Sequence, residues 1–428
     1  MKTARLSAPA LIVLVLAGSA LADPSKGDRP GVEAVMRKME AATLAGDAKA
    51  YLALVDPTDA VFFKEQSNLA KDWSKHKAEA FTLKIIEGKT EEEAKPADKP
   101  AEKPADDKAD GEKKPEAKDE QVGTAVTDPV FDETRAEFRM QMTWKMDGWK
   151  RERTLTMPVM FVRDSKDGAW KFAGEKWEVV TIPVSDTFNG VRICFEPGSQ
   201  ALKKTADLVG QVMPEVRTSV DRHFKLKVPG PVTVKLYQSM RHLQASIWLS
   251  YTDGLSGWNE PGEAIKILPG RRSTADGLKG LLGHEYGHCA TFTMGPHATD
   301  AAWWVLEGAA ELASSAFKPN AAKRRDERVR SWLKNDELAP WDKIAPFPLP
   351  KDDEHFMANV YTQGEHMLAF INTHYGEDQR INFIRGMCEG KTIDKSSRDA
   401  IGLPWADVDA AWRQSIEQKM NTEPKDDK

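Results

Sequence analysis

The sequence GHEYGH at positions 283–288 places two histidines, His284 and His288, four residues apart. On a helix this spacing puts both imidazoles on the same face, where both can reach one metal ion. Glu285 lies between them, where its carboxylate can meet a water molecule bound to that metal. The stretch therefore predicts a metal-binding helix around which the rest of the chain is arranged.

The sequence WWVLEGAAE at positions 303–311 supplies the acidic residues that such a site needs. A catalytic zinc ion has three protein ligands and one open position for water, and two histidines with one glutamate are a usual set. Glu307 lies in a second apolar helical pattern, which could pack beside the first, so we expect it to be the third ligand. Glu311 is one helical turn further on and is expected to hold a ligand imidazole by its free ring nitrogen.

Together, the H-E-x-x-H motif and the E-G-x-x-E motif that follows it resemble the gluzincin zinc metallopeptidases, in particular the peptidase MA-like group. The resemblance covers roughly the C-terminal half of the chain. It implies that His284, His288 and Glu307 bind Zn2+ and that Glu285 is the general base. It also implies that a Tyr or His downstream steadies the oxyanion, with Tyr361 as the first candidate and His366 as the second.

The resemblance also implies how a substrate would bind. In gluzincins an edge strand just before the zinc helix pairs with an extended peptide, and residues 264–268 stand in that position. The Gly-x-Met-Glu-Asn signature of the related aminopeptidases is absent, and Trp258-Asn259-Glu260 is only vaguely similar to it. A general peptidase is therefore favoured over a dedicated aminopeptidase.

The N-terminus has the pattern of a secretory signal peptide over residues 1–22. Lys2 and Arg5 precede an apolar run from residue 8 to residue 17, and Ala20-Leu21-Ala22 is a small-x-small cleavage site. The run is shorter than the roughly 20 apolar residues of a membrane span, and no other stretch could span a bilayer. We expect export to the periplasm or the medium, with an uncleaved N-terminal anchor as the alternative.

Composition is consistent with an exported protein of two or more domains. The chain has 428 residues, 40% of them hydrophobic, so it can bury substantial cores. Its net charge is only -5, with acidic and basic residues interleaved, so nothing indicates nucleic acid as a partner. Three cysteines are too few for a disulfide framework.

We expect the fold class α+β, with a small α+β domain of the nuclear-transport-factor-2-like or cystatin-like type at residues 30–185. Apolar residues at helical spacing begin it, and Asp147-Gly148 and Asp167-Gly168 indicate hairpins between strands. The strands are expected at residues 81–86, 138–144, 154–163 and 170–180. Residues 87–121 are almost wholly charged, Ala and Pro, which predicts a disordered insertion. The apolar stripe of the sheet could line a ligand pocket, although a plain core is preferred.

Residues 190–420 are predicted to form a mainly helical peptidase domain with a small N-terminal sheet, followed by a polar tail at 421–428. Strands are expected at residues 191–195 and 232–237. The helical pattern of residues 201–224 contains Gly210 and Pro214, which should bend or split that helix.

The function predicted from these patterns is that of an exported zinc peptidase acting on a peptide or protein. One alternative is a zinc-binding pseudo-peptidase that serves as an extracytoplasmic binding protein. Against it, a structural zinc site would not require Glu285. The other alternative, a structural protein with an accidental motif, requires both glutamate-containing motifs to be coincidences.

Overall fold

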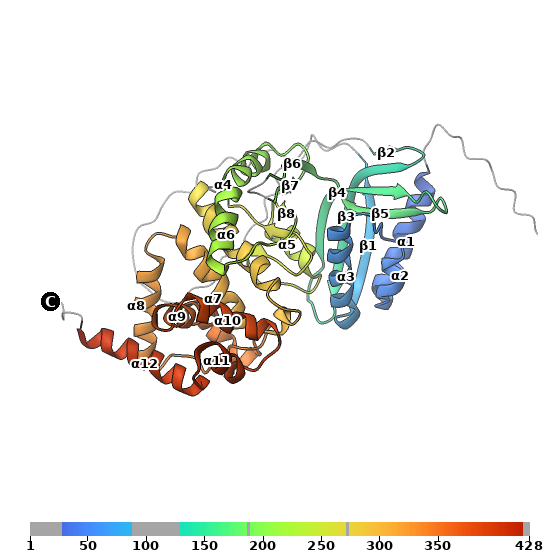
Figure 1. Cartoon of the computed structure of the whole chain (residues 1–428). Helices are drawn as coiled ribbons and strands as arrows, with labels where there is room; N and C mark the ends of the chain where they lie inside the picture. The colour runs from blue at the N-terminus through green and yellow to red at the C-terminus, as the bar shows by residue number, and fades with distance from the viewer. Residues whose placement is uncertain (1–27, 88–128, 186–188, 271–273, 423–428) are drawn as a thin grey trace, which may run out of the picture.

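The computed structural model describes residues 28–87, 129–185, 189–270 and 274–422. The predicted signal peptide, almost all of the predicted insertion and residues 423–428 of the predicted tail lie outside these ranges. The described chain is α+β, with two sheets and a mainly helical C-terminal part (Figure 1). In these ranges we find no helix with the length and apolar character that a bilayer crossing needs.

The first sheet is antiparallel and carries three helices on one face (Figure 1). Its helices are α1 (Arg29–Ala45), α2 (Ala48–Leu52) and α3 (Ala60–Lys75), and its strands are β1 (Ala78–Ile86), β2 (Val130–Phe131), β3 (Arg135–Met146), β4 (Arg153–Arg163) and β5 (Trp170–Glu175). The strand order is β1-β3-β4-β5, with β2 paired to β3. Alternate residues of β3 are buried, which is the two-residue period of a sheet with one face on the core. The finer likeness to a nuclear-transport-factor-2-like or cystatin-like domain stays a prediction.

The apolar stripe of this sheet forms a packed core. Phe138, Met140, Met142 and Trp144 of β3 are all buried among side chains of α1, α3 and the neighbouring strands. The cavity beside the stripe has a volume of about 70 Å³. Pockets for small-molecule ligands usually measure roughly 300–1,000 Å³, so the stripe serves packing.

The second sheet has the strand order β6-β7-β8-β10-β9. Its strands are β6 (Glu178–Ile182), β7 (Val191–Phe195), β8 (Val232–Leu236), β9 (Gly257–Trp258) and β10 (Ile265–Ile267). β7, β8 and β10 are parallel, while β6 and β9 are antiparallel to their neighbours.

Two predictions about strands are wrong in detail. Residues 170–180 form two strands that belong to different sheets, so the boundary between the two parts falls near Trp177, before the predicted residue 190. No proline or turn dipeptide marks this break, which explains why the pattern alone concealed it. The segment at 264–268 is the interior strand β10, and the edge strand is the short β9.

The remaining chain is helical. Its helices are α4 (Gln200–Phe224), α5 (Met240–Ile247), α6 (Ala275–Phe292), α7 (Trp303–Ser314), α8 (Ala321–Lys334), α9 (Met357–His374), α10 (Glu377–Cys388), α11 (Ile393–Ile401) and α12 (Trp405–Thr422), with short 3-10 turns at Ala298–Asp300, Ser315–Phe317 and Lys351–Phe356. Helix α4 is continuous through Gly210 and Pro214, so the predicted split does not occur, while the predicted bend stays a prediction. Its long apolar face packs on the second sheet and on α6, and this burial outweighs the local cost of a proline.

Helices α7 and α9 cross in close contact at two glycines, Gly308 and Gly364. A Cβ atom on Gly308 would overlap the backbone of Gly364, and one on Gly364 would overlap the carbonyl of Trp304. The absence of both side chains therefore sets the distance between the two helices. This crossing brings Tyr361 of α9 beside Trp303, one turn before Glu307, with the two ring centres 6.1 Å apart.

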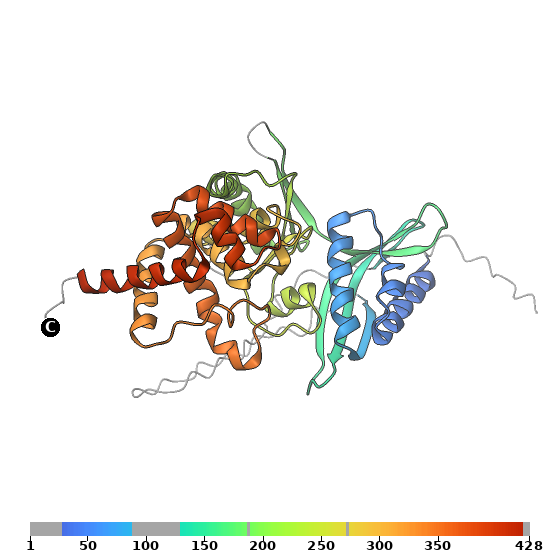
Figure 2. The same ribbon diagram turned by 60° about the horizontal axis from the view of Figure 1, so that its bottom comes forward.

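The two parts of the chain meet across a polar interface, along which they lie side by side in both views (Figures 1 and 2). The contacts are Glu65 with Lys235, Asn68 with Glu263, Asp72 with Ser250, Glu175 with His242, and Arg139 with Glu196. Glu65 and Lys235 are both buried. Burial alone would lower the pKa of Lys235, but the Glu65 carboxylate raises it above its usual value.

Breaking this buried pair should destabilise the protein. Lys235→Met leaves the Glu65 carboxylate buried and unpaired, and we expect a loss of about 3–5 kcal/mol in the free energy of unfolding. The double variant E65Q/K235M should lose clearly less, because neither buried charge remains. Urea unfolding measures both changes. Lys38→Met, at an exposed position of α1, is the control; an equal loss in that control would contradict the assignment.

Candidate metal centre

Helix α6 is held so that its histidines face α7. Thr274 caps its N-terminus by accepting a hydrogen bond from the Gly277 N–H. On another side of the helix, Leu278, Leu282 and Tyr286 are buried in the core. The Tyr286 hydroxyl donates a hydrogen bond of 2.9 Å to Asp221 of α4, which fixes the rotation of α6.

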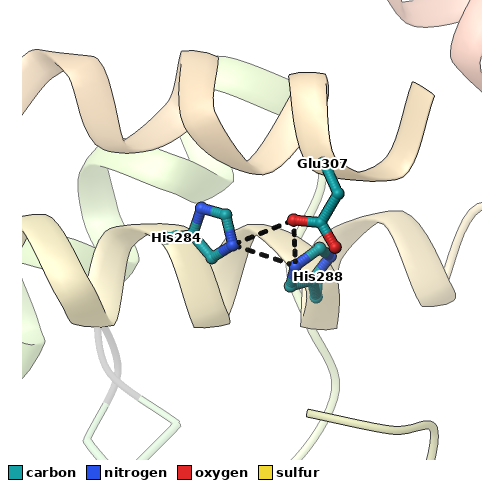
Figure 3. A group of neighbouring side chains, drawn as sticks. All are labelled: His284, His288 and Glu307. Atoms are coloured by element: carbon teal, nitrogen blue, oxygen red, sulfur yellow. Dashed lines mark hydrogen bonds and ion pairs between the residues drawn. The ribbon is translucent and has the colours of Figure 1, made fainter. Parts of the chain in front are cut away.

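His284, His288 and Glu307 converge between α6 and α7 (Figure 3). The Glu307 Oε2 atom lies 3.2 Å from His284 Nε2 and 3.5 Å from His288 Nε2, and the two Nε2 atoms are 3.2 Å apart. Four-coordinate zinc with bonds of about 2.0–2.1 Å separates its ligand atoms by roughly 3.3 Å. The three atoms therefore already have the spacing of zinc ligands. In the described part of the chain, no second group of three such residues meets this criterion.

The donor set also fits zinc by its chemistry. Glu307 Oε2 is buried and makes no hydrogen bond of acceptable geometry, so its lone pairs are directed to the point between the histidines. The other carboxylate oxygen, Oε1, accepts a 2.8 Å hydrogen bond from Trp303 Nε1, one turn earlier on α7. Two imidazole nitrogens and one carboxylate oxygen are a usual ligand set for a catalytic zinc ion.

Glu311 lies behind His284, on the side away from the three converging atoms. Its Oε1 atom is 3.1 Å from His284 Nδ1, and its Oε2 atom accepts a 2.7 Å hydrogen bond from Lys318 Nζ. A carboxylate at Nδ1 sets the ring orientation and leaves Nε2 free for a metal. The structure thus places Glu311 where the sequence analysis expected it.

The pKa shifts of this cluster reflect burial and charge pairing. Burial alone would lower the pKa of His284, but the Glu307 and Glu311 carboxylates next to its two ring nitrogens raise it to about 10. Burial opposes ionisation of Glu311, but His284 and Lys318 lower its pKa to about 2. The pKa of Glu307 is likewise well below its usual range, because the two histidines outweigh its burial. The cluster therefore holds ionised carboxylates at neutral pH, as metal ligands must be.

Glu285 is buried beside the edge strand. A Cβ atom on Gly257 of β9 would overlap the Glu285 carboxylate, so a larger residue at position 257 would displace the Glu285 side chain from its present position. Burial raises the pKa of Glu285, although His284 and His288 act to lower it. A raised pKa brings a carboxylate closer to the range in which it can both accept and release a proton.

The two oxyanion candidates lie in different environments. The Tyr361 ring is 6.2 Å from that of His284, lines the cleft, and makes no hydrogen bond to any described residue through its hydroxyl. Burial raises the pKa of Tyr361, so the hydroxyl remains a donor. His366 points away from the cleft and accepts a 2.7 Å hydrogen bond from Trp412 Nε1. Burial lowers the pKa of His366 to about 3. Of the two, only Tyr361 is brought to the metal ligands.

A cleft of about 1930 Å³ opens over these residues. One wall is aromatic, because Phe347 bridges Trp303 of α7 and Trp258 of β9 with ring-centre distances of 4.8 and 6.0 Å. Trp248 and Tyr251 extend this wall along the edge strand. Such a wall offers apolar surface for a substrate side chain close to the metal ligands.

Sequence reasoning missed several residues of the site. Trp303 precedes Glu307 by four positions, a spacing that could have indicated a hydrogen bond along one helix face. Lys318 reaches Glu311 from the turn that follows α7, seven residues later, and Gly257 reaches the site only through the packing of β9 against α6, so neither has the helical spacing that could have indicated its contact.

Comparisons with known proteins give only distant structural likeness. No family model matches the sequence, and no curated protein matches it. One similar solved structure is a mutant M1 zinc metallopeptidase from Deinococcus radiodurans bound to a Tyr-Ser-Ala substrate, with 14% identity and a TM-score of 0.37 over 70% of this chain. Another is the M1 zinc metallopeptidase from the same organism, with 13% identity and a TM-score of 0.34. This chain covers 66% of the length of each of them.

The ligand assignment predicts a graded loss of zinc. Glu307→Ala should abolish stoichiometric binding, because one of three ligands is removed. Glu311→Gln should keep a site with roughly 10- to 100-fold weaker affinity, since it changes only the support of His284. Competition with a chromogenic chelator measures both affinities. Unchanged affinity in Glu307→Ala would contradict its role and make Glu311 the next candidate ligand.

Proposed function

We propose that this chain is an exported zinc-dependent peptidase that hydrolyses peptide bonds. The observation that carries the proposal is the convergence of His284, His288 and Glu307 with zinc-ligand spacing at the base of an open cleft. A closed structural zinc site would have a fourth protein ligand, and a catalytic one keeps that position open. Export rests on the signal-peptide pattern of residues 1–22.

The proposed reaction divides its tasks among the side chains of the site. His284, His288 and Glu307 would hold a zinc ion, which would supply a water of lowered pKa and a Lewis acid for the scissile carbonyl. Glu285 takes a proton from the attacking water and passes it to the leaving amine. Tyr361 donates a hydrogen bond to the oxygen of the scissile carbonyl as it gains negative charge.

Strand β9 is proposed to align the substrate. It is the last strand in its sheet order, and Gly257 and Trp258 both line the cleft. An extended peptide can pair with its free edge, main chain to main chain. Because Gly257 also abuts the Glu285 carboxylate, a peptide on this edge would pass directly over the proposed base.

The variant Glu285→Gln tests the proposed role of the base. It keeps all three ligands, so zinc content should remain at one ion per chain while hydrolysis of an unfolded protein falls at least 100-fold, the lower range for general acid–base catalysis. Elemental analysis and a fluorescence cleavage assay measure the two. A chelator should stop the wild-type reaction, and added zinc should restore it. Full activity of Glu285→Gln would refute the mechanism.

Tyr361→Phe should lower kcat by about 10²–10³ with little change in KM, because its hydrogen bond is made only as the oxyanion forms. His366→Gln offers a matched control, since this buried side chain faces Trp412 and lies outside the cleft lining. Steady-state kinetics on one fluorogenic peptide measures both variants. A larger loss of kcat in His366→Gln than in Tyr361→Phe would reverse the assignment.

If the wild-type protein binds one zinc ion but cleaves no peptide or unfolded protein, the chain is instead a zinc-binding pseudo-peptidase. That outcome would leave the ligand assignment intact.

A further inference from the structure

Helix α3 of the first part of the chain forms one wall of the cleft. Lys64, Asn68, Lys71 and Lys75 all line it. Their spacing of four, three and four residues places them on a single face of the helix. We call Lys64, Lys71 and Lys75 the lysine stripe.

The lysine stripe carries charge that its own helix does not neutralise. The two acidic residues within the same stretch of α3 are buried in the interface, where Glu65 pairs with Lys235 and Asp72 accepts hydrogen bonds from Ser250. In the described part of the chain, none of the three stripe lysines forms an ion pair. Lys71 and Lys75 are exposed, and Lys64 is half-buried.

The opposite charges of the cleft are mostly engaged elsewhere. Glu307 lies within ion-pair distance of His284 and His288, and Glu311 forms an ion pair with Lys318. Glu260 is near Lys64, and burial, with a contribution from Glu263, raises its pKa to about 7, so it is only partly ionised at neutral pH. Asp72, Asp253, Glu285 and Glu354 also line the cleft, and Asp72 is engaged by Ser250 and His76. The α3 wall therefore presents excess positive charge to the cleft.

The segment at 257–263 connects the lysine stripe to the metal centre. At one end Gly257 abuts Glu285, and at the other Gly262 packs against the Lys64 side chain while Glu263 accepts a 2.6 Å hydrogen bond from Asn68. An extended chain advances about 3.3 Å per residue. A peptide that continues past β9 therefore meets α3 within a few residues of the bond over Glu285.

We propose that the lysine stripe selects polypeptide substrates that carry acidic residues on one side of the scissile bond. This inference rests on the proposed peptidase function and adds its substrate class. Carboxylate side chains of the substrate would pair with Lys71 and Lys75, while the aromatic wall contacts an apolar residue close to the metal. Contacts of this exposed kind act mainly on selectivity and on the rate of association, and salt weakens them.

The test uses three fluorogenic peptides that share one apolar core and carry flanks of Glu, Gln or Lys. Wild-type enzyme should prefer the Glu-flanked peptide in kcat/KM, and added salt should reduce this preference. The charge reversal K71E/K75E should lower the ratio of Glu-flanked to Lys-flanked kcat/KM by roughly tenfold, the size expected when two exposed charge contacts become repulsive. The Gln-flanked peptide should be little affected.

The matched control is K38E/K49E, which changes net charge equally at two exposed lysines outside the cleft lining. It should leave the ratio unchanged. An unaltered ratio in K71E/K75E, or an equal fall in both double variants, would overturn the proposal while leaving peptidase activity established.

A binding measurement separates this proposal from the peptidase function itself. Fluorescence anisotropy of a labelled Glu-flanked peptide, with zinc-loaded Glu285→Gln protein, requires no turnover. Weaker binding in the E285Q/K71E/K75E background than in E285Q/K38E/K49E would support the lysine stripe even if no peptide is cleaved. Equal binding in the two backgrounds would overturn it.

Discussion

Burying the carboxylate of Glu307 is the constraint on which the rest of the structure depends. An ionised carboxylate loses much of its hydration when buried, and the loss must be offset by groups placed around it. Trp303 donates to one oxygen, while the other faces two imidazoles. The imidazole of His284 is oriented by Glu311, and the charge of Glu311 is in turn paired with Lys318. The site is thus a connected network of polar contacts between α6, α7 and the turn that follows α7.

The packing around the site serves this arrangement. Tyr286 secures α6 to α4 from behind, and the glycine crossing of α7 with α9 brings Tyr361 close to His284. A few tenths of an ångström at these contacts would change ligand spacing, because close-packed interiors transmit displacements. The buried pairs at the interface with the first sheet hold α3 beside the cleft in a similar way.

The sequence predicts the site better than its surroundings. Local spacing along a helix puts His284 on the same face as His288, and Glu307 on the same face as Glu311, since i and i+4 positions share a face. That the two helices pack side by side was expected from the zinc ligand set and the family resemblance, and not from spacing. Three features depend on contacts between distant parts of the chain, and no local sequence pattern predicts them. They are the break between β5 and β6, the position of β9 at the sheet edge and the continuity of α4. Tyr361 and His366 show the same limit, because they lie on one helix yet face opposite environments.

The cleft is lined by residues from both parts of the chain, and only the second part carries the metal ligands. Substitutions on the face of α3 that lines the cleft can therefore change its charge without touching the metal ligands. Related chains could therefore differ in substrate specificity and keep the same hydrolytic reaction, if only the charge of this helix changed. The first part of the chain would then set which substrates reach the metal centre, while the second part carries out the reaction.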